Sequence, residues 1–253
     1  MADPIAPVQL TDGEIKFYRQ EGFLLIPGLM SEQNAANLHV EVMELMNSIG
    51  GFEGNKLKQS WEYKTGSHID ALINSQPLRG LAGQLMGGES TLYLPFTAVK
   101  GVGGGTFHFH QDNNYTRFDD GMGGINLWIA LMPMTPENGC LMVVPRSHTQ
   151  GTVESVASPD GDFHRKVKYD PADFLPVRMR AGDCIAFSRL TVHGSGPNLT
   201  DIPRVAYAIQ FHRNDVSWID KETGEKKLLT QFPRWTNKPV EQYSVPAGKR
   251  DGH

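Results

Sequence analysis

Several features that mark other protein classes are scarce or missing here. The 253 residues include only two cysteines, Cys140 and Cys184. Each lies in an apolar, strand-like run, which favours two buried thiols over a disulfide and indicates a reducing compartment. No apolar stretch approaches the ~18 residues that a membrane span requires. The N-terminus lacks the basic region and apolar run of a signal peptide. We therefore expect a cytoplasmic protein with no membrane partner.

The chain also lacks a large excess of charge of either sign. The net charge is −4 at pH 7, the pI is near 6.1, and the densest charged cluster, 221–227, alternates in sign. This balance argues against a polyanionic partner such as nucleic acid. Hydrophobic residues make up 39% and charged residues 21%, as in ordinary globular proteins. We expect a small-molecule substrate, and no sequence feature indicates the oligomeric state.

Two common catalytic signatures are absent. The glycine-rich segment 101–105 is not followed by the Lys-Ser/Thr pair and helix of a phosphate-binding loop. Ser188 and Ser195 lack the strand–turn–helix setting of a nucleophile elbow. The sequence therefore supports neither nucleotide-dependent chemistry nor serine hydrolysis.

The N-terminal third carries helix signals. A capping-box pattern at Thr11–Glu14 opens a helix that ends at Gly22, and residues 23–26 then form a buried strand. Ser31 caps a second helix with an apolar stripe. A third, shorter helix is predicted over 77–85.

From about Leu92 onward the chain consists of short apolar runs between Gly, Pro, Asn and Asp. This pattern of short apolar runs indicates a sandwich or barrel instead of parallel βαβ units. The strands are predicted near 92–100, 106–112, 125–133, 140–145, 183–188, 190–193 and 204–212. The polar segment 149–176 contains three prolines and is predicted to be an insertion or lid loop.

The length fits one domain, 1–253. Within it we expect an N-terminal helical part over about 8–88 and a mainly β core over about 90–213. Residues 214–253 would then form a C-terminal extension.

The pair His110 and Asp112 suggests a metal site. Residues two apart on an extended strand share a face, so an imidazole and a carboxylate can reach one ion together. His193 opens another predicted strand and is followed by small residues. Two histidines and one carboxylate on one face of a metal leave other positions open, which suits non-haem Fe(II) oxygen chemistry. Taken singly, each of the nine histidines would be assigned a structural or exposed role.

His108 shares a face with His110 and Asp112 by the same argument. It is either a third histidine ligand or a group that orients a ligand or packs beside it. We favour the second interpretation, because a further ligand would close a position that oxygen chemistry needs.

Arg204 extends the metal hypothesis to a co-substrate. It starts an alternating strand that can aim its guanidinium inward, where its fork of donors suits a carboxylate. The distal carboxylate of 2-oxoglutarate would supply that partner while the keto-acid end chelates iron. Ser195 can donate a hydrogen bond to the same carboxylate. An ordinary ion pair between Arg204 and an aspartate or glutamate is the alternative.

The order and spacing of four motifs resemble those of the phytanoyl-CoA dioxygenase family. The motifs are 110–112, 137–148, 193–198 and Arg204. The helix–strand–helix opening is also similar, so the resemblance covers roughly residues 11–213. The segment 214–253 has no counterpart in it.

This resemblance implies a mainly β fold with flanking N-terminal helices, a double-stranded β-helix (jelly-roll, cupin-like) core. It also implies Fe(II), 2-oxoglutarate and O₂ as cofactor and co-substrates. Carried over by position, the catalytic iron ligands are His110, Asp112 and His193, and the 2-oxoglutarate contacts are Arg204, Ser195 and Trp128. Thr97 is also expected to face this co-substrate, from the preceding strand. The alternative role for Trp128 is that of a large core residue.

Further residues are expected around the substrate. Asn113, Asn114, Tyr115 and Arg117 directly follow the metal motif, and their polarity indicates a small, polar substrate. Exposed loop residues have the same composition, which is the alternative. Arg146 stands where the family commonly has glycine and is expected at the rim of the pocket.

The function that follows is a non-haem Fe(II)/2-oxoglutarate-dependent dioxygenase. It would hydroxylate an unactivated C–H bond of a small molecule and release succinate and CO₂, with desaturation or epimerisation as related outcomes. Asp112 argues against halogenation, because the related halogenases carry a small residue at that position. Two alternatives are a cupin-type metalloenzyme that does not use 2-oxoglutarate, and a non-catalytic binding module on the same barrel.

Overall fold

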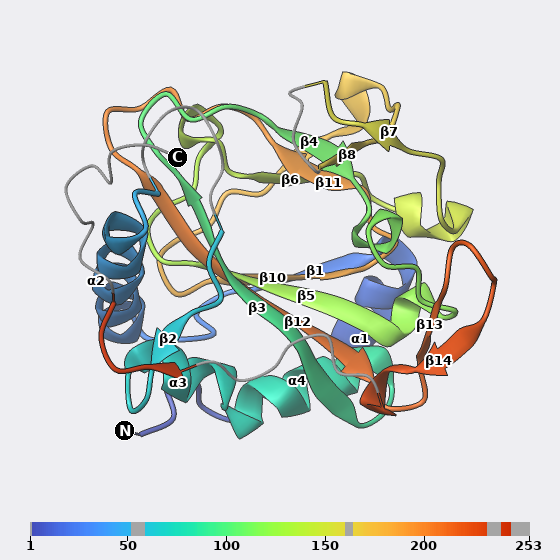
Figure 1. Ribbon diagram of the computed structural model, residues 1–253, viewed down its shortest axis with the longest axis horizontal. Helices are drawn as coiled ribbons and strands as arrows, with labels where there is room; N and C mark the ends of the chain where they lie inside the picture. The colour runs from blue at the N-terminus through green and yellow to red at the C-terminus, as the bar shows by residue number, and fades with distance from the viewer. Residues whose placement is uncertain (1, 52–58, 160–163, 232–238, 244–253) are drawn as a thin grey trace.

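Two antiparallel sheets face each other, and helices cover the outer face of the larger one (Figure 1). This computed structural model describes residues 2–51, 59–159, 164–231 and 239–243. Within that part of the chain, no helix is long and apolar enough to cross a membrane.

The four described α-helices are α1 (Asp12–Glu21), α2 (Glu32–Ser48), α3 (His68–Ile73) and α4 (Gln76–Met86). Three of them, α1, α2 and α4, lie where local sequence signals predict. The capping box between Thr11 and Glu14 is formed, and α1 ends at Gly22, whose φ of 84° favours glycine. Ser31 caps α2 as predicted. Helix α3 was not predicted, because six residues are too few to show a helical period.

The larger sheet joins strands from both ends of the chain. Its order is β1 (Phe23–Ile26), β10 (Cys184–Ser188), β5 (Gly124–Ala130), β12 (Arg204–Arg213) and β3 (Ser90–Lys100). Every neighbouring pair is antiparallel. All seven residues of β5 are buried, because helices cover one face and the second sheet faces the other.

The smaller sheet carries two of the predicted metal ligands. Its order is β4 (Phe107–His110), β11 (His193–Ser195), β6 (Leu141–Val143) and β9 (Leu175–Pro176). Strands β4 and β11 are antiparallel, with His193 directly opposite His110. This register brings together two residues that are far apart in the sequence.

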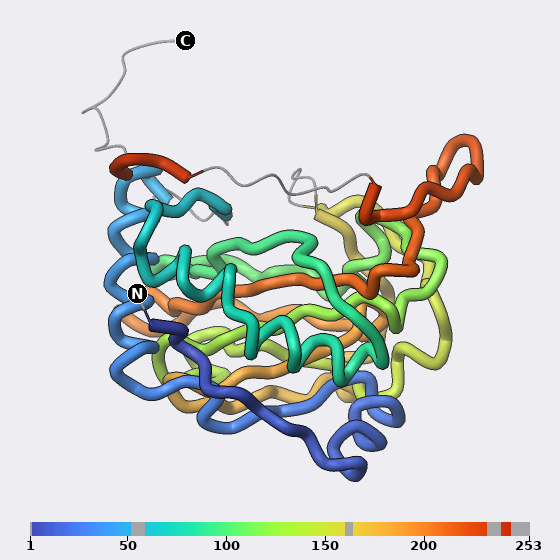
Figure 2. The backbone as a smooth tube through the Cα atoms, turned by 90° about the horizontal axis from the view of Figure 1, so that it is seen from below, coloured from blue at the N-terminus to red at the C-terminus, as the bar shows by residue number. Residues whose placement is uncertain are grey.

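Shorter elements complete the chain. The remaining strands are β2 (Tyr63–Lys64), β7 (Val156–Ala157), β8 (Arg165–Lys166), β13 (Ser217–Ile219), β14 (Lys226–Leu228) and β15 (Pro239–Val240). Six 3₁₀ turns are η1 (Asp112–Asn114), η2 (Gly121–Gly123), η3 (Pro136–Asn138), η4 (Ser147–Gln150), η5 (Pro171–Asp173) and η6 (Leu229–Gln231). The β13–β14 hairpin extends beyond the two sheets at one end (Figure 2).

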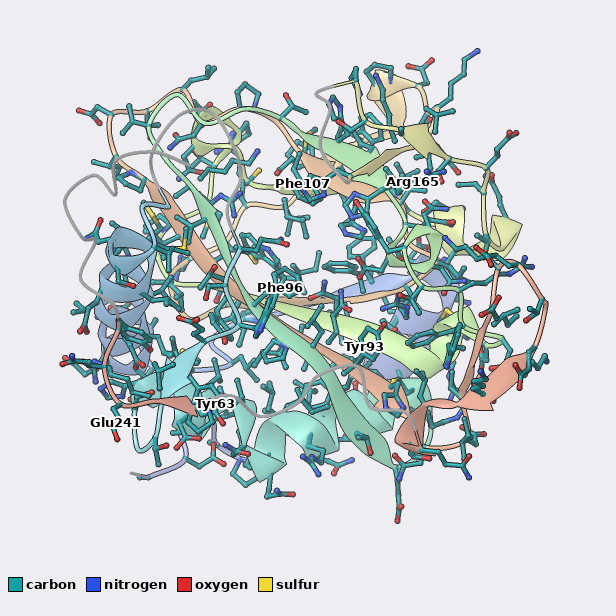
Figure 3. The ribbon with its side chains drawn as sticks, viewed as in Figure 1. Tyr63, Tyr93, Phe96, Phe107, Arg165 and Glu241 are labelled. Carbon is teal, nitrogen blue, oxygen red and sulfur yellow. The ribbon has the colours of Figure 1, made fainter. Side chains whose placement is uncertain are left out.

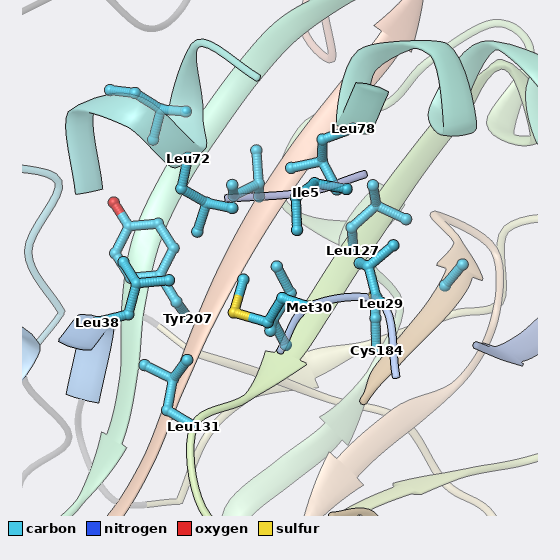
Figure 4. Close-up of a cluster of buried hydrophobic side chains, with 14 of the residues drawn as sticks. Ile5, Leu29, Met30, Leu38, Leu72, Leu78, Leu127, Leu131, Cys184 and Tyr207 are labelled. Carbon is cyan, nitrogen blue, oxygen red and sulfur yellow. The ribbon is translucent and has the colours of Figure 1, made fainter. Parts of the chain in front are cut away.

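The main hydrophobic core lies between the helices and the outer face of the larger sheet. Leu38, Leu72 and Leu78 come from α2, α3 and α4, and they pack with Leu127 of β5 and Tyr207 of β12 (Figure 4). Each buried leucine contributes about 1.5–3 kcal/mol relative to an exposed one. The helices therefore hold the larger sheet rigid and leave its inner face available for a cavity.

The described part of the predicted loop 149–176 contains β7, β8, β9 and two 3₁₀ turns. It packs against β4, where the Val167 N–H donates to the Phe109 carbonyl at 2.8 Å. Residues 160–163 lie outside the described part. The two cysteines are buried free thiols, as predicted.

Gly22 and Gly28 provide a matched test of packing at the β1 edge. Both have positive φ, 84° and 61°. A Cβ at Gly22 would lie 2.4 Å from Nδ1 of His148, whereas one at Gly28 would meet nothing within 4 Å among the described residues. Alanine at either position costs about 1–2 kcal/mol for the left-handed backbone.

We expect the clash in Gly22→Ala to lower the free energy of unfolding by a further ~1–3 kcal/mol. Urea unfolding of the two variants measures the difference. Equal losses in the two variants would contradict this packing.

Candidate active site

Three predicted ligands form one buried cluster. His110 ends β4, Asp112 begins η1 and His193 begins β11. One candidate ligand atom from each lies within 4.8 Å of the others. The Nε2 atoms of His110 and His193 are 3.8 and 3.7 Å from Oδ1 of Asp112. Ligand atoms about 2.1 Å from a shared ion lie roughly 3–4 Å apart, so the cluster has the dimensions of a metal site.

Backbone carbonyls fix both imidazole rings. Nδ1 of His110 lies 2.7 Å from the carbonyl oxygen of His108, and Nδ1 of His193 lies 2.9 Å from that of Thr191. A carbonyl only accepts, so each Nδ1 donates and each Nε2 presents its lone pair toward Asp112. His108 therefore orients His110 through its backbone, and its side chain is not part of the three-residue cluster.

A polar network holds the Asp112 carboxylate. Its Oδ2 accepts hydrogen bonds from Gln210 Nε2 at 3.0 Å and from Asn126 Nδ2 at 3.3 Å. Arg189 donates to the Asp112 carbonyl and to Gln210 Oε1. Sequence reasoning did not identify Asn126, Arg189 or Gln210, because their only signal is a polar residue in a buried strand or turn.

The protonation states suit a metal ion. Burial raises the pKa of Asp112, but the adjacent His193, His110 and Arg189 side chains together hold it well below its usual value. Burial lowers the pKa of His193 to about 4, and His110 adds to that shift. The cluster thus consists of an ionised carboxylate and a neutral His193 imidazole, the forms that bind metals.

A cavity of about 210 Å³ lies between the two sheets and contains the cluster in its wall. Most of its lining is apolar and comes from both sheets. Figure 3 shows Phe96 of β3 and Phe107 of β4 on opposite sides of this space. At one side, the Tyr115 hydroxyl lies 3.3 Å from Nδ1 of His164. The 149–176 segment therefore contributes directly to the cavity through His164.

Arg204 lines the same cavity, and one of its hydrogen-bond donors has no partner among the described residues. Nη1 donates to the Ala98 carbonyl at 3.0 Å, and the guanidinium carbon lies 5.2 Å from the Trp128 ring centre. The buried Nε finds no partner among the described residues. Buried donors are normally satisfied, so this atom marks a place where a ligand acceptor fits.

Lys100 lies directly across from Arg204 on β3. Its ammonium nitrogen donates to the carbonyls of Ser195 and Gly196. Burial, and secondly the Arg204 charge, lower the pKa of Lys100 to about 6. The ion pairs found among the described residues include neither Lys100 nor Arg204. The alternative of an ordinary Arg204 ion pair therefore has no support in that part of the chain.

Ser195 and Trp128 also line the cavity, as predicted for co-substrate contacts, whereas Thr97 does not. Its hydroxyl accepts from the Ser60 N–H at 2.9 Å and lies 3.3 Å from the Met46 sulfur. It thus faces the opposite side of β3, so the expectation that Thr97 contacts the co-substrate does not fit its position.

The residues after the metal motif divide into two groups. Tyr115 lines the cavity, as expected. The Asn113 side chain instead donates to the Thr152 hydroxyl, and that of Asn114 donates to the Val153 carbonyl. Both asparagines are buried and fasten η1 to the following loop, and neither lines the cavity. Their polarity therefore reflects the hydrogen bonds of a tight turn.

Arg117 and Arg146 both lie outside the cavity. Arg117 lines a second, outer hollow next to it. Arg146 adopts a φ of 62° and donates to Glu21 at 3.0 Å, with its side chain 73% exposed. The expectation that Arg146 forms the pocket rim therefore does not fit. The left-handed backbone explains why glycine suits this position.

Comparison with known proteins agrees with the sequence motifs. The sequence model described as phytanoyl-CoA dioxygenase matches residues 18–206. A methylphosphonate hydroxylase of Gimesia maris is 28% identical over 260 residues, covering 92% of this chain and 98% of that protein. An ectoine dioxygenase of Streptomyces avermitilis is 26% identical, covering 83% and 81%.

Solved structures share the fold. The non-haem alpha ketoglutarate dependent carbocyclase SnoK superimposes with a TM-score of 0.66 at 23% identity, covering 84% of this chain and 89% of that one. EvdO2 from Micromonospora carbonacea var. aurantiaca gives a TM-score of 0.69 at 20% identity, covering 87% and 97%. These likenesses confirm the predicted jelly-roll core.

His110 and His108 allow a direct test of ligand identity. We expect His110→Ala to abolish stoichiometric Fe(II) binding, because it removes one of three ligands. His108→Ala should leave Fe(II) binding close to that of the wild type, because the variant keeps the backbone carbonyl that orients His110. Anaerobic Fe(II) titration followed by calorimetry measures both. Loss of binding in both variants would make the His108 side chain a ligand and contradict the assignment.

Lys100 should make stability depend on pH. Its folded pKa of about 6 lies below the 10.5 of the unfolded chain, so the unfolded chain binds more protons between these values. Stability from this group therefore rises with pH across that window, by at most about 1.4 kcal/mol per pH unit.

We expect the stability of the metal-free protein, relative to Lys100→Met, to increase from pH 6.5 to pH 8.5. Urea unfolding at each pH provides the measurement. A difference that does not change with pH would show that Lys100 stays protonated in the folded chain.

Proposed function

Because the chain belongs to the phytanoyl-CoA dioxygenase family of iron(II)- and 2-oxoglutarate-dependent oxygenases, we propose that it hydroxylates an unactivated C–H bond of a small molecule. One observation carries the proposal. The His110, Asp112 and His193 cluster and the unpartnered Nε of Arg204 face the same buried cavity.

His110, Asp112 and His193 would hold the iron. Iron(II) bound there supplies O₂ activation, coupled to oxidative decarboxylation of 2-oxoglutarate to succinate and CO₂, and the oxidising power for the C–H bond. The protein's contribution is geometric, because the two carbonyls and the Gln210–Asn126 amides fix all three ligands before metal arrives. Three ligands leave coordination positions for the co-substrate and O₂.

Arg204 would bind the distal carboxylate of 2-oxoglutarate. Its Nε and free donor positions can form charge-assisted hydrogen bonds with that group, and the Ser195 side chain lines the same region. Trp128 packs over the guanidinium and limits its movement. The apolar walls, including Phe96 and Phe187, exclude water and strengthen these interactions.

The relatives suggest which substrates to screen first. Those matched over most of the chain include proteins named methylphosphonate hydroxylase, ectoine dioxygenase and L-proline trans-4-hydroxylase. All three names specify a small polar molecule, consistent with a cavity of about 210 Å³. Methylphosphonate is the first candidate, because that relative is aligned over 98% of its length.

The co-substrate assignment is tested by Arg204→Met, with Arg146→Met as the matched control. In anaerobic titrations of the Fe(II) protein, we expect a weak visible charge-transfer band as 2-oxoglutarate chelates the iron. Arg204→Met should raise the apparent Kd by about tenfold or more through loss of charged hydrogen bonds. Arg146→Met should leave it unchanged, because that side chain is 73% exposed and pairs with Glu21.

An unchanged Kd in Arg204→Met would favour the cupin-type alternative, in which Arg204 is only structural. No band in the wild-type protein would favour a binding module. For activity, succinate formation should accompany hydroxylation of a screened substrate. Failure of the Fe(II) protein to consume any 2-oxoglutarate, even without substrate, would refute the proposed reaction.

A further inference from the structure

A second hollow lies outside the cavity that contains the metal cluster. Its walls are the segment after η1, including Arg117, and the β13–β14 hairpin, including Trp218 and Lys221. The hollow shares Tyr93, Tyr115 and Thr116 with the inner cavity. The two spaces are therefore adjacent and share these three residues in their walls, and we call the outer one the vestibule.

Positive charge from three separate segments converges on the vestibule. Lys221 donates from Nζ to the Asn114 carbonyl at 2.6 Å, two residues beyond the Asp112 ligand. Partial burial lowers the pKa of Lys221, and the charges of Arg165 and then Arg117 lower it further. Arg117 and Lys221 thus line the vestibule together, and Arg165 lies near enough to act on Lys221, in a protein whose net charge is −4.

Neighbouring acids in the described chain are occupied elsewhere. Asp119 lies 3.4 Å from Lys226 and accepts the Ser217 N–H. Asp220 accepts two N–H groups of its own turn, from Glu222 and Thr223. Neither carboxylate contributes to the pKa shift of Lys221. Among the residues that the structure describes, Arg117 and Lys221 therefore form no ion pair with a carboxylate.

Aromatic side chains line the vestibule beside these cations. Trp218 lies in the vestibule wall, and Tyr115 lies between the vestibule and the inner cavity. The Arg165 side chain is held in place by a hydrogen bond from Nε to the Ser155 hydroxyl at 3.1 Å. The backbone N–H of Arg165 donates to the Tyr115 hydroxyl. Fixed cations above an apolar cavity attract an oxyanion and orient the rest of the molecule inward.

We propose that the vestibule binds an oxyanion group of the substrate, a phosphonate or a carboxylate, through Arg117 and Lys221. The carbon that reacts then extends past Tyr115 toward the metal cluster. This inference rests on the proposed function, since it assigns the substrate class of the same cavity. The proposal makes Arg117 a specificity residue, whereas the sequence analysis predicted only that Arg117 is one of several substrate contacts.

The test uses the anaerobic Fe(II) protein saturated with 2-oxoglutarate, so that Arg204 is already engaged. Calorimetry measures the Kd of three probes: methylphosphonate, acetate and the neutral tetrahedral analogue dimethyl sulfone. The variants are Arg117→Gln, Lys221→Gln and their combination. Lys226→Gln is the matched control, because Lys226 lies on the same hairpin, is exposed and pairs with Asp119.

We expect at least one anion to bind the wild type, with its Kd raised about tenfold or more in the double variant. The control should bind like the wild type, and dimethyl sulfone should not distinguish the proteins. Tighter binding of methylphosphonate than of acetate identifies a phosphonate-type group, and the reverse order identifies a carboxylate.

Absence of anion binding, or binding unaffected by the double variant, overturns the inference. Wild-type consumption of 2-oxoglutarate, measured in parallel, separates the two failures. If the wild type consumes 2-oxoglutarate but the anion result is negative, only the vestibule assignment is refuted. If the wild type does not consume 2-oxoglutarate, the proposed function is refuted as well.

Discussion

The site depends on the antiparallel register of β4 and β11. That register places His193 directly opposite His110, and the turn η1 that follows β4 brings Asp112 to the same point. A shift by one residue would turn these side chains to the other face of the sheet. The helices that pack on the larger sheet hold the opposite wall of the cavity, so the ligands face a space of defined size.

The polar groups of the cavity form two separate sets. One set surrounds the metal cluster, where Arg189 and Gln210 fix Asp112 and backbone carbonyls fix the histidines. The other is the Lys100–Arg204 pair, in which Arg204 Nε has no partner among the described residues. Iron held by the cluster would bind the keto-acid end of 2-oxoglutarate, and the buried guanidinium would bind its distal carboxylate. This division explains how one cavity can orient 2-oxoglutarate without any large rearrangement.

Local patterns predicted most of the fold and the chemical core of the site. Period-two spacing singled out His110 and Asp112 as a pair, although Asp112 lies in η1 beyond the end of β4 and reaches the site through that turn. Capping signals located α1 and α2. The predictions that failed depended on information that a single sequence does not contain. Thr97 was assigned to the wrong face because the pairing of β3 decides which side is inward. Asn113 and Asn114 were taken as substrate contacts because a polar residue in a tight turn resembles a binding residue, and Gln210 and Arg189 were missed because only the folded sheet brings them to Asp112.

The most direct test of the account is a structure of crystals grown anaerobically with Fe(II) and 2-oxoglutarate. The account predicts one iron bound by Nε2 of His110, Nε2 of His193 and the Asp112 carboxylate, with the distal carboxylate of 2-oxoglutarate on Arg204. Iron at other ligands, or a distal carboxylate that does not contact Arg204, would contradict it.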